Sequence, residues 1–146
     1  MAQPQPVTIM ALVRRKASMT PEEYSRHWRE VHAPIVSPWL AKHGVLKYRQ
    51  VHISPDSNKI MNGNAHGGNA HGGTLKVIDK DLGFDGILEV QVPSWESFRK
   101  ALEDPYYVEV VRPDEQNFFD EKQMVWSLGS EYIGVDGGKV LVGVEV

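Results

Sequence analysis

The sequence predicts an α+β protein with a ferredoxin-like βαββαβ arrangement, in which split helices pack on an antiparallel sheet. Three observations carry this prediction: apolar runs of strand length, helical stretches that begin at well-defined caps, and the order in which the two alternate. With 146 residues the chain can bury one hydrophobic core, so we expect residues 1–146 to form a single domain.

The first strand and the first helix have the clearest signals. Residues 7–13 (VTIMALV) form an apolar run between prolines and two arginines, which predicts a buried strand. The helix is predicted to begin after Thr20, an N-cap residue that forms a capping box with Glu23. Pro34 is expected to end or kink this helix, because proline lacks a backbone N–H. A second helical piece is predicted over residues 35–42.

The remaining elements follow from the same kinds of signal. Four further strands are expected at residues 45–53, 86–92, 123–132 and 139–146, the last of them added to an edge of the sheet. Helices are expected over residues 95–103, where Ser94 is the N-cap, and over residues 106–111.

A long irregular segment separates the second and third strands, at residues 54–85. Its middle, residues 63–73, is a glycine- and asparagine-rich repeat that carries His66 and His71, and we expect it to act as a mobile lid. The two histidines match metal-binding segments weakly, and no clustered carboxylates or H-E-x-x-H motif accompany them, so no metal site is predicted.

The predicted topology places the helices on one face of the sheet and leaves the other face bare. An uncovered sheet face is either wetted or buried by another surface. We therefore expect a homodimer in which two copies stack their sheets.

Composition excludes several classes of protein. The net charge is −3 and no basic stripe is present, which argues against nucleic-acid binding. The chain has no cysteine, which excludes disulfides and thiolate catalysis. The N-terminal apolar run is only residues 7–13, too short for a membrane span and wrongly flanked for a secretory signal. A cytoplasmic protein without a membrane partner is the expectation.

The second strand carries the most informative residues for function. Leu46, Tyr48, Gln50 and His52 share one face of it because side chains alternate along a strand. In one interpretation these polar groups face water. In the other they line a cavity together with Glu89 and Gln91 of the neighbouring strand, where His52 is a general base and Tyr48 a proton or hydrogen-bond donor.

The histidines of the first helix also allow two interpretations. His32, at the predicted helix end, either caps the C-terminus or reaches the mouth of the cavity. His27 has charged neighbours and is expected at the surface. Four tryptophans are present, and most of them are expected in the core.

Several blocks of the sequence resemble the EthD-domain family. The blocks follow one another in the family's order and span residues 7 to about 132; they are RRKASMTPEEYSRHWREVHAP, LKYRQVH, DGILEV, DPYY and PDEQNFFD. Within that family the chain resembles fungal members that act as decarboxylases or dehydratases in aromatic polyketide pathways. The glycine-rich repeat and the C-terminal strand depart from the family pattern.

This resemblance implies a dimeric α+β barrel and chemistry without a cofactor or metal on a small aromatic polyketide. Acid–base side chains in a dry aromatic cavity suit either decarboxylation or dehydration. The residues expected to be catalytic are His32, His52 and Tyr48, and those expected to bind substrate are Gln50, Glu89, Trp28, Trp39 and Asp85. Two alternatives stay open: a cofactor-free monooxygenase or cyclase of the same barrel superfamily, and a non-catalytic dimeric binding protein.

Overall fold

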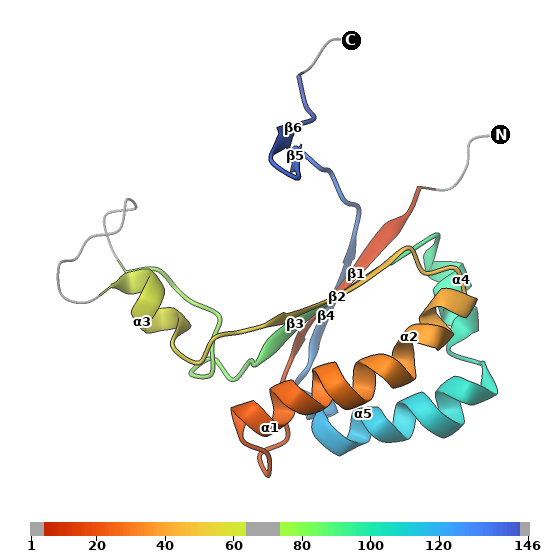
Figure 1. The fold of residues 1–146 in the computed structure, drawn as a ribbon, viewed down its shortest axis with the longest axis horizontal. Coiled ribbons are helices and arrows are strands. Elements are labelled where there is room, and N and C mark those ends of the chain that lie inside the picture. The colour runs from red at the N-terminus through yellow and green to blue at the C-terminus, as the bar shows by residue number, and fades with distance from the viewer. Residues whose placement is uncertain (1–4, 64–73, 144–146) are drawn as a thin grey trace.

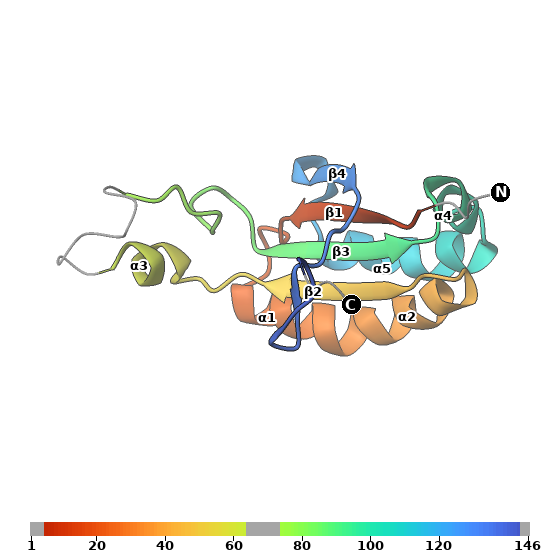
Figure 2. The same ribbon diagram turned by 90° about the horizontal axis from the view of Figure 1, so that it is seen from above.

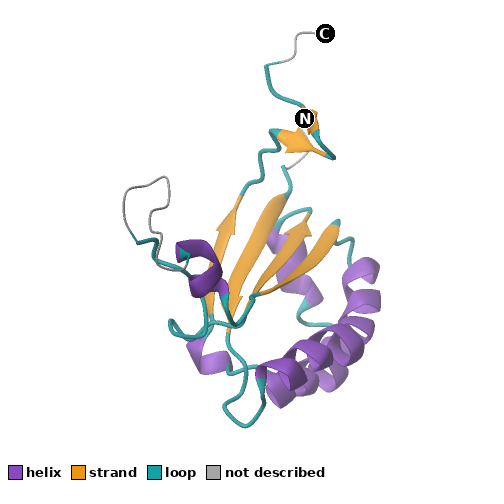
Figure 3. Ribbon diagram, turned by 60° about the vertical axis from the view of Figure 1, so that its left-hand side comes forward, coloured by secondary structure: helices purple, strands orange, loops and turns teal. Residues whose placement is uncertain are grey.

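The structure, a computed structural model, describes residues 5–63 and 74–143. Four strands form an antiparallel sheet in the order β2-β3-β1-β4, with β1 at Val7–Val13, β2 at Lys47–His52, β3 at Gly86–Val92 and β4 at Val125–Gly129. The main helices lie on one face of this sheet (Figures 1 and 3). The α+β, ferredoxin-like prediction is confirmed, and the bounds of β1 and β3 are those predicted.

The first helical run lies along the sheet and continues past Pro34, where an end or a kink was expected. It comprises α1 (Pro21–Arg26), the π-helical segment η1 (His27–His32) and α2 (Ala33–Lys42). The N–H of Ala33 bonds the carbonyl of Trp28, five residues back, instead of four. This wider turn directly before the proline lets the helix continue past the donor that Pro34 lacks.

The second helical run also contains a π-helical turn directly before a proline. After α4 (Trp95–Ala101) come the π-helical segment η2 (Tyr107–Val111) and α5 (Arg112–Phe118). The N–H of Arg112 bonds the carbonyl of Tyr107, again five residues back and directly before a proline, Pro113. Helix α5 lies beyond the helix expected at residues 106–111, and it brings acidic residues into the interior.

The strand register decides which side chains meet the helices. Ile9, Ala11 and Val13 of β1 are buried beneath the helices. Val90 of β3 pairs with Ile9 on one side and with Tyr48 of β2 on the other, so Tyr48 shares this face. In β2 the polar face Tyr48, Gln50 and His52 is therefore the one that turns toward the helices.

The long segment after β2 contains a helix that the sequence did not predict, α3 (Ser57–Asn62). The side-chain amide of Asn62 accepts from the backbone N–H of Leu75 and donates to its carbonyl, so the two ends of the intervening segment are held together. The repeat, the lid prediction, His66 and His71 fall within residues 64–73 and lie outside the described residues.

The C-terminal part differs from the prediction of two long strands. A 3-10 turn, η3 (Glu121–Gln123), precedes β4, which ends at Gly129 because its partner Thr8 lies next to the start of β1. Beyond it, β5 (Val135–Asp136) and β6 (Lys139–Val140) form a separate hairpin, which lies away from the main sheet in Figure 1 and is projected over β2 and β3 in the view from above in Figure 2. Gly137 and Gly138 join them with positive φ, as a two-residue hairpin turn requires.

Among the helices of the described residues, none is both long and apolar enough to cross a bilayer.

Candidate active site

A cavity of about 360 Å³ lies between the sheet and the two helical runs. Its walls are largely aromatic, and the rings that line it include Trp28, Trp39, Phe98, Tyr107, Phe119 and Trp126. Trp28 and Trp39, which were predicted from the sequence to bind the substrate, are both buried residues that line the cavity. Its polar lining residues include Arg112 and Glu121, together with His32, Tyr48 and Glu115. A mostly apolar cavity with a few polar groups is the usual form of a small-molecule site.

His32 is buried, with 4% of its surface exposed, and a carboxylate holds it in place. Its Nδ1 lies 2.8 Å from Oδ2 of Asp114. The other oxygen of this carboxylate, Oδ1, lies 3.0 Å from His27 Nε2 and accepts from Asn117 Nδ2 at 3.3 Å. His27, expected at the surface, is thus drawn inward by Asp114. His32 lies in the middle of a continuous helical run, so it does not cap a helix end.

The protonation states of this pair follow from its surroundings. Burial opposes the charge of Asp114, but hydrogen bonds from His32, Asn117 and His27 together hold the pKa of its carboxyl below the ordinary value. A carboxylate can only accept, so His32 Nδ1 carries the hydrogen and Nε2 keeps a lone pair. Burial lowers the pKa of His32 more than Asp114 raises it, so the ring is neutral at pH 7 and able to act as a base.

Glu115 can act as an acid in the cavity in which His32 can act as a base. Burial is the largest influence on this side chain and raises the pKa of its carboxyl to about 7. Its Oε1 is buried and has no hydrogen-bond partner among the described residues. The carboxyl is therefore protonated in part of the molecules at neutral pH and can donate to a ligand. Sequence reasoning missed Asp114 and Glu115; the available signal was Pro113 followed by two acids, which is typical of a helix start.

The orientation of Tyr48 is set by a chain of hydrogen bonds whose direction can be derived. The carbonyl of Trp28 accepts only, so the group of Gln50 that lies 2.9 Å from it is the amide nitrogen. The same nitrogen donates to the Tyr48 hydroxyl at 2.6 Å. Tyr48 therefore uses a lone pair for Gln50 and keeps its own hydrogen for the cavity. Burial raises the pKa of Tyr48 to about 12, so that hydrogen is present at neutral pH.

The side-chain oxygen of Gln50 forms a hydrogen bond with His52. Because its nitrogen faces Trp28, the Gln50 oxygen must face His52 Nε2, 2.8 Å away, and that nitrogen carries the hydrogen. His52 Nδ1 is then an acceptor, and the hydroxyl of Ser25 donates to it at 2.6 Å. Both ring nitrogens of His52 are thus engaged, and its tautomer is fixed.

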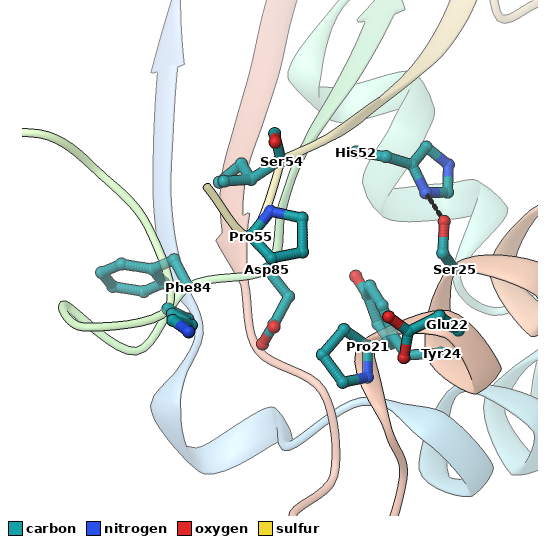
Figure 4. A pocket seen from close by; sticks show the side chains of 11 residues that line it. Pro21, Glu22, Tyr24, Ser25, His52, Ser54, Pro55, Phe84 and Asp85 are labelled. Carbon is teal, nitrogen blue, oxygen red and sulfur yellow. Dashed lines mark hydrogen bonds between the residues drawn. The ribbon is translucent and has the colours of Figure 1, made fainter. Parts of the chain in front are cut away.

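His52 and Asp85 lie in a second, smaller pocket rather than in the aromatic cavity. This pocket of about 240 Å³ lies between α1, the end of β2 and the segment before β3 (Figure 4). Asp85 accepts from the backbone N–H of Arg15 at 3.0 Å and forms an ion pair with the Arg15 side chain at 3.2 Å. Tyr48 and His52 share a face of β2 as expected, but the structure places them in different pockets.

The expected placement of Glu89 and Gln91 beside Tyr48 is not met. Arg49 pairs with Glu89, and Lys47 with Gln91, so both residues of β3 lie on the bare face of the sheet. There the Arg49 side chain donates to the Glu89 carboxylate at 2.8 Å. The cause is the strand period of two, which puts Val90 rather than Glu89 on the face of Tyr48.

Comparisons with known proteins agree with the ferredoxin-like fold. Residues 16–122 match the EthD domain family. Dehydratase aurZ of Gibberella zeae is 26% identical over 144 residues, covering 94% of this chain and 86% of the relative. Decarboxylase nsrE of Aspergillus novofumigatus is 28% identical over 131 residues, covering 86% and 81%. A dimeric protein of ferredoxin-like fold from Bacteroides fragilis superposes with a TM-score of 0.54 at 10% identity, covering 86% of this chain and 96% of that one.

Proposed function

The chain belongs to the EthD-domain family, and we propose that it is a cofactor-independent lyase, a decarboxylase or dehydratase of an aromatic polyketide intermediate in fungal-type secondary metabolism. Relatives that carry the names dehydratase and decarboxylase support this kind of reaction. The observation that carries the proposal is the aromatic cavity in which a neutral, carboxylate-held His32 and the protonatable Glu115 occur together.

Dehydration of an aldol-type alcohol uses His32, Tyr48 and Glu115. His32 Nε2 removes the proton next to the ketone, while Asp114 orients the ring and stabilises the imidazolium that forms. The ketone oxygen gains negative charge and receives the hydrogen bond of Tyr48. The Glu115 carboxyl then donates its proton to the departing hydroxyl, which leaves as water. The carbon–oxygen bond breaks, and a conjugated double bond replaces it.

Decarboxylation of a β-keto acid needs fewer of these groups. The hydrogen bond from Tyr48 to the ketone oxygen draws electrons from the breaking carbon–carbon bond, and carbon dioxide leaves. The product of this step is an enolate. Neutral His32 first takes the proton of the substrate's carboxyl group on Nε2 and then returns it to the carbon of the enolate, so the ring ends neutral as it began. Each acid or base contributes a factor of about 10²–10⁴, and positioning in the cavity supplies the rest.

In this proposal His52 and Gln50 act through Tyr48. Gln50 holds the lone-pair side of the Tyr48 hydroxyl, and His52 holds the oxygen of Gln50. Gln50 and His52 are therefore positioning residues for the lyase reaction, whereas Asp85, in the smaller pocket, is not assigned to the same substrate.

The test is incubation of the purified protein with an aromatic polyketide-synthase product under argon, followed by mass spectrometry. Loss of carbon dioxide or of water from the substrate is the expected result. A gain in mass that appears only in a parallel incubation in air would instead indicate an oxygenase, and binding without any change in mass in either incubation would indicate a non-catalytic protein.

A further inference from the structure

We propose that the smaller pocket is a second catalytic site, in which Ser25 is a nucleophile that accepts short acyl groups from esters or thioesters. This activity goes beyond the lyase reaction: its nucleophile and its pocket are different, although His52 and Gln50 take part in both. It rests on the Ser25–His52–Gln50 hydrogen-bond chain and on a buried phenol, Tyr24, that lines the same pocket.

The chain has the geometry of an activated nucleophile. The Ser25 hydroxyl donates to His52 Nδ1 over 2.6 Å, which is the contact a base needs to remove the hydroxyl proton. His52 Nε2 in turn donates to the Gln50 oxygen, whose direction is fixed by the Trp28 carbonyl. A neutral amide that orients a histidine serves the same purpose in Cys-His-Asn proteases.

The state of His52 suits a base. Burial has the larger effect and the positive charge of Arg29 the smaller one; both lower the pKa of His52, so the ring is neutral at pH 7. Its neutral form carries the lone pair on Nδ1, toward Ser25, because Gln50 holds the hydrogen on Nε2.

Tyr24 provides the second, independent observation. Its side chain is 1% exposed, and its hydroxyl has no hydrogen-bond partner among the described residues. Burial, and to a lesser degree the charge of Asp85, raise the pKa of Tyr24, so the hydroxyl keeps its hydrogen. In Figure 4 the side chains of Tyr24, Ser25 and His52 border one hollow, with Asp85 across it. A buried donor left without a partner costs folding free energy, and a ligand oxygen in this pocket would satisfy it.

These groups define a complete acyl transfer. The Ser25 oxygen bonds the carbonyl carbon of the substrate as its proton passes to His52, and the carbonyl oxygen becomes an oxyanion that accepts from Tyr24. The bond to the alcohol or thiol then breaks, and that leaving group takes the proton from His52. Water attacks the acyl–Ser25 ester by the same route, with its proton passing through His52 back to Ser25, and a carboxylic acid is released.

The size and walls of the pocket indicate a short acyl group. The volume of about 240 Å³ has an apolar side formed by Phe84, Ile53 and two prolines, against which a short hydrocarbon chain fits; Glu22, Lys80 and Asp85 also line the pocket. Esters and thioesters share the reacting carbonyl, and separate substrates distinguish them.

The direct test is covalent labelling of the whole chain with a fluorophosphonate probe, read out by peptide mass spectrometry. We expect an adduct on Ser25 and none in Ser25→Ala. Ser97→Ala is the matched control, because Ser97 lies on α4 outside this pocket, and it should label like the wild type. An unmodified Ser25 overturns the proposal. Because the label is read on Ser25 itself, this result does not depend on whether the lyase assay succeeds.

Turnover is tested with p-nitrophenyl acetate as the ester and the acetyl thioester of N-acetylcysteamine as the thioester. Ser25→Ala should lower hydrolysis of the accepted substrate by at least about a hundredfold, and Tyr24→Phe should lower kcat by about 10²–10³, the loss typical of one oxyanion donor. Tyr24→Phe keeps the ring and removes a hydroxyl that bonds no described residue, so the variant should fold. Hydrolysis by Ser25→Ala at the wild-type rate overturns the proposal.

Discussion

Burial shifts the pKa values of His32 and Glu115 in opposite directions within one cavity. It lowers the pKa of His32 and raises that of Glu115 to about 7. Dehydration needs the neutral ring and the protonated carboxyl together. The rate should therefore fall as the pH drops through the lowered pKa of His32, and fall again as the pH rises through about 7. The pH dependence of kcat/KM checks both limbs.

Glu115→Gln tests which group causes the alkaline limb. Glutamine keeps the size of the side chain but cannot lose or supply this proton. We expect a dehydration rate at least about a hundredfold lower, with the fall above pH 7 removed. Glu103→Gln, at an exposed site just after the end of α4, is the control. A variant that keeps the wild-type alkaline limb would assign that limb to another group.

The hydrogen-bond chain behind Tyr48 makes a prediction about coupling. Gln50→Ala and His52→Ala should each lower kcat of the lyase reaction by about 10–100-fold, because the Tyr48 hydroxyl loses its fixed orientation. Since both act through the same hydroxyl, each should have little effect in a Tyr48→Phe background. The double-mutant cycle measures this. Fully additive effects would show that the chain does not act through Tyr48.

At the residue scale the sequence predicted His32 and Tyr48 as site residues but not their partners. Asp114 lies 82 positions from His32 in the chain, and no local pattern links the two. The pKa of Glu115 depends on burial, which only the tertiary structure reveals. Glu89 was placed beside Tyr48 because the pairing register between the two strands cannot be read from either strand alone.

At the element scale, β3 and the helix η1 touch where Gly86 faces the ring of Trp28. A methyl group added at Gly86 would lie 2.5 Å from that ring. Gly86→Ala should therefore lower the free energy of unfolding by about 1–3 kcal/mol, as overpacking of a core does. Denaturant unfolding measures the change. Gly134→Ala is the control, since its added methyl meets only an ordinary contact at 3.9 Å. Equal stabilities of the two variants would contradict this packing.

The elements themselves were largely predictable, and the exceptions have physical causes. Apolar runs and caps determine β1, β3 and the start of α1, where Thr20 accepts from the N–H of Glu23. The π-turns before Pro34 and Pro113 were not predictable from propensity, because packing of the whole run keeps the helix intact across each proline.

At the scale of the whole molecule, the described residues of one chain leave the sheet face opposite the helices largely open. Met10 in the central strand β1 is 39% exposed there, beside Glu89 and Ser127 on the neighbouring strands. We predict a homodimer that buries this face, with an interface near or above about 2,000 Å² in total. Light scattering should give twice the mass of one chain at micromolar concentration.

A charge placed on that face should separate the two copies. Met10→Asp is expected to give monomers, because it would bury an unpaired carboxylate at the interface. Val108→Asp is the control, since Val108 is 57% exposed on the helical side. A monomeric wild type, or a Met10→Asp variant that remains dimeric, would contradict the predicted interface.

The central claim is a lyase site built on His32, and one comparison tests it most directly. Wild type and His32→Ala are incubated with the same aromatic polyketide substrate under argon, and product is measured by mass spectrometry while circular dichroism checks the fold. The account predicts loss of carbon dioxide or water by the wild type and a rate at least about a hundredfold lower in folded His32→Ala. Equal rates in the two proteins would contradict it.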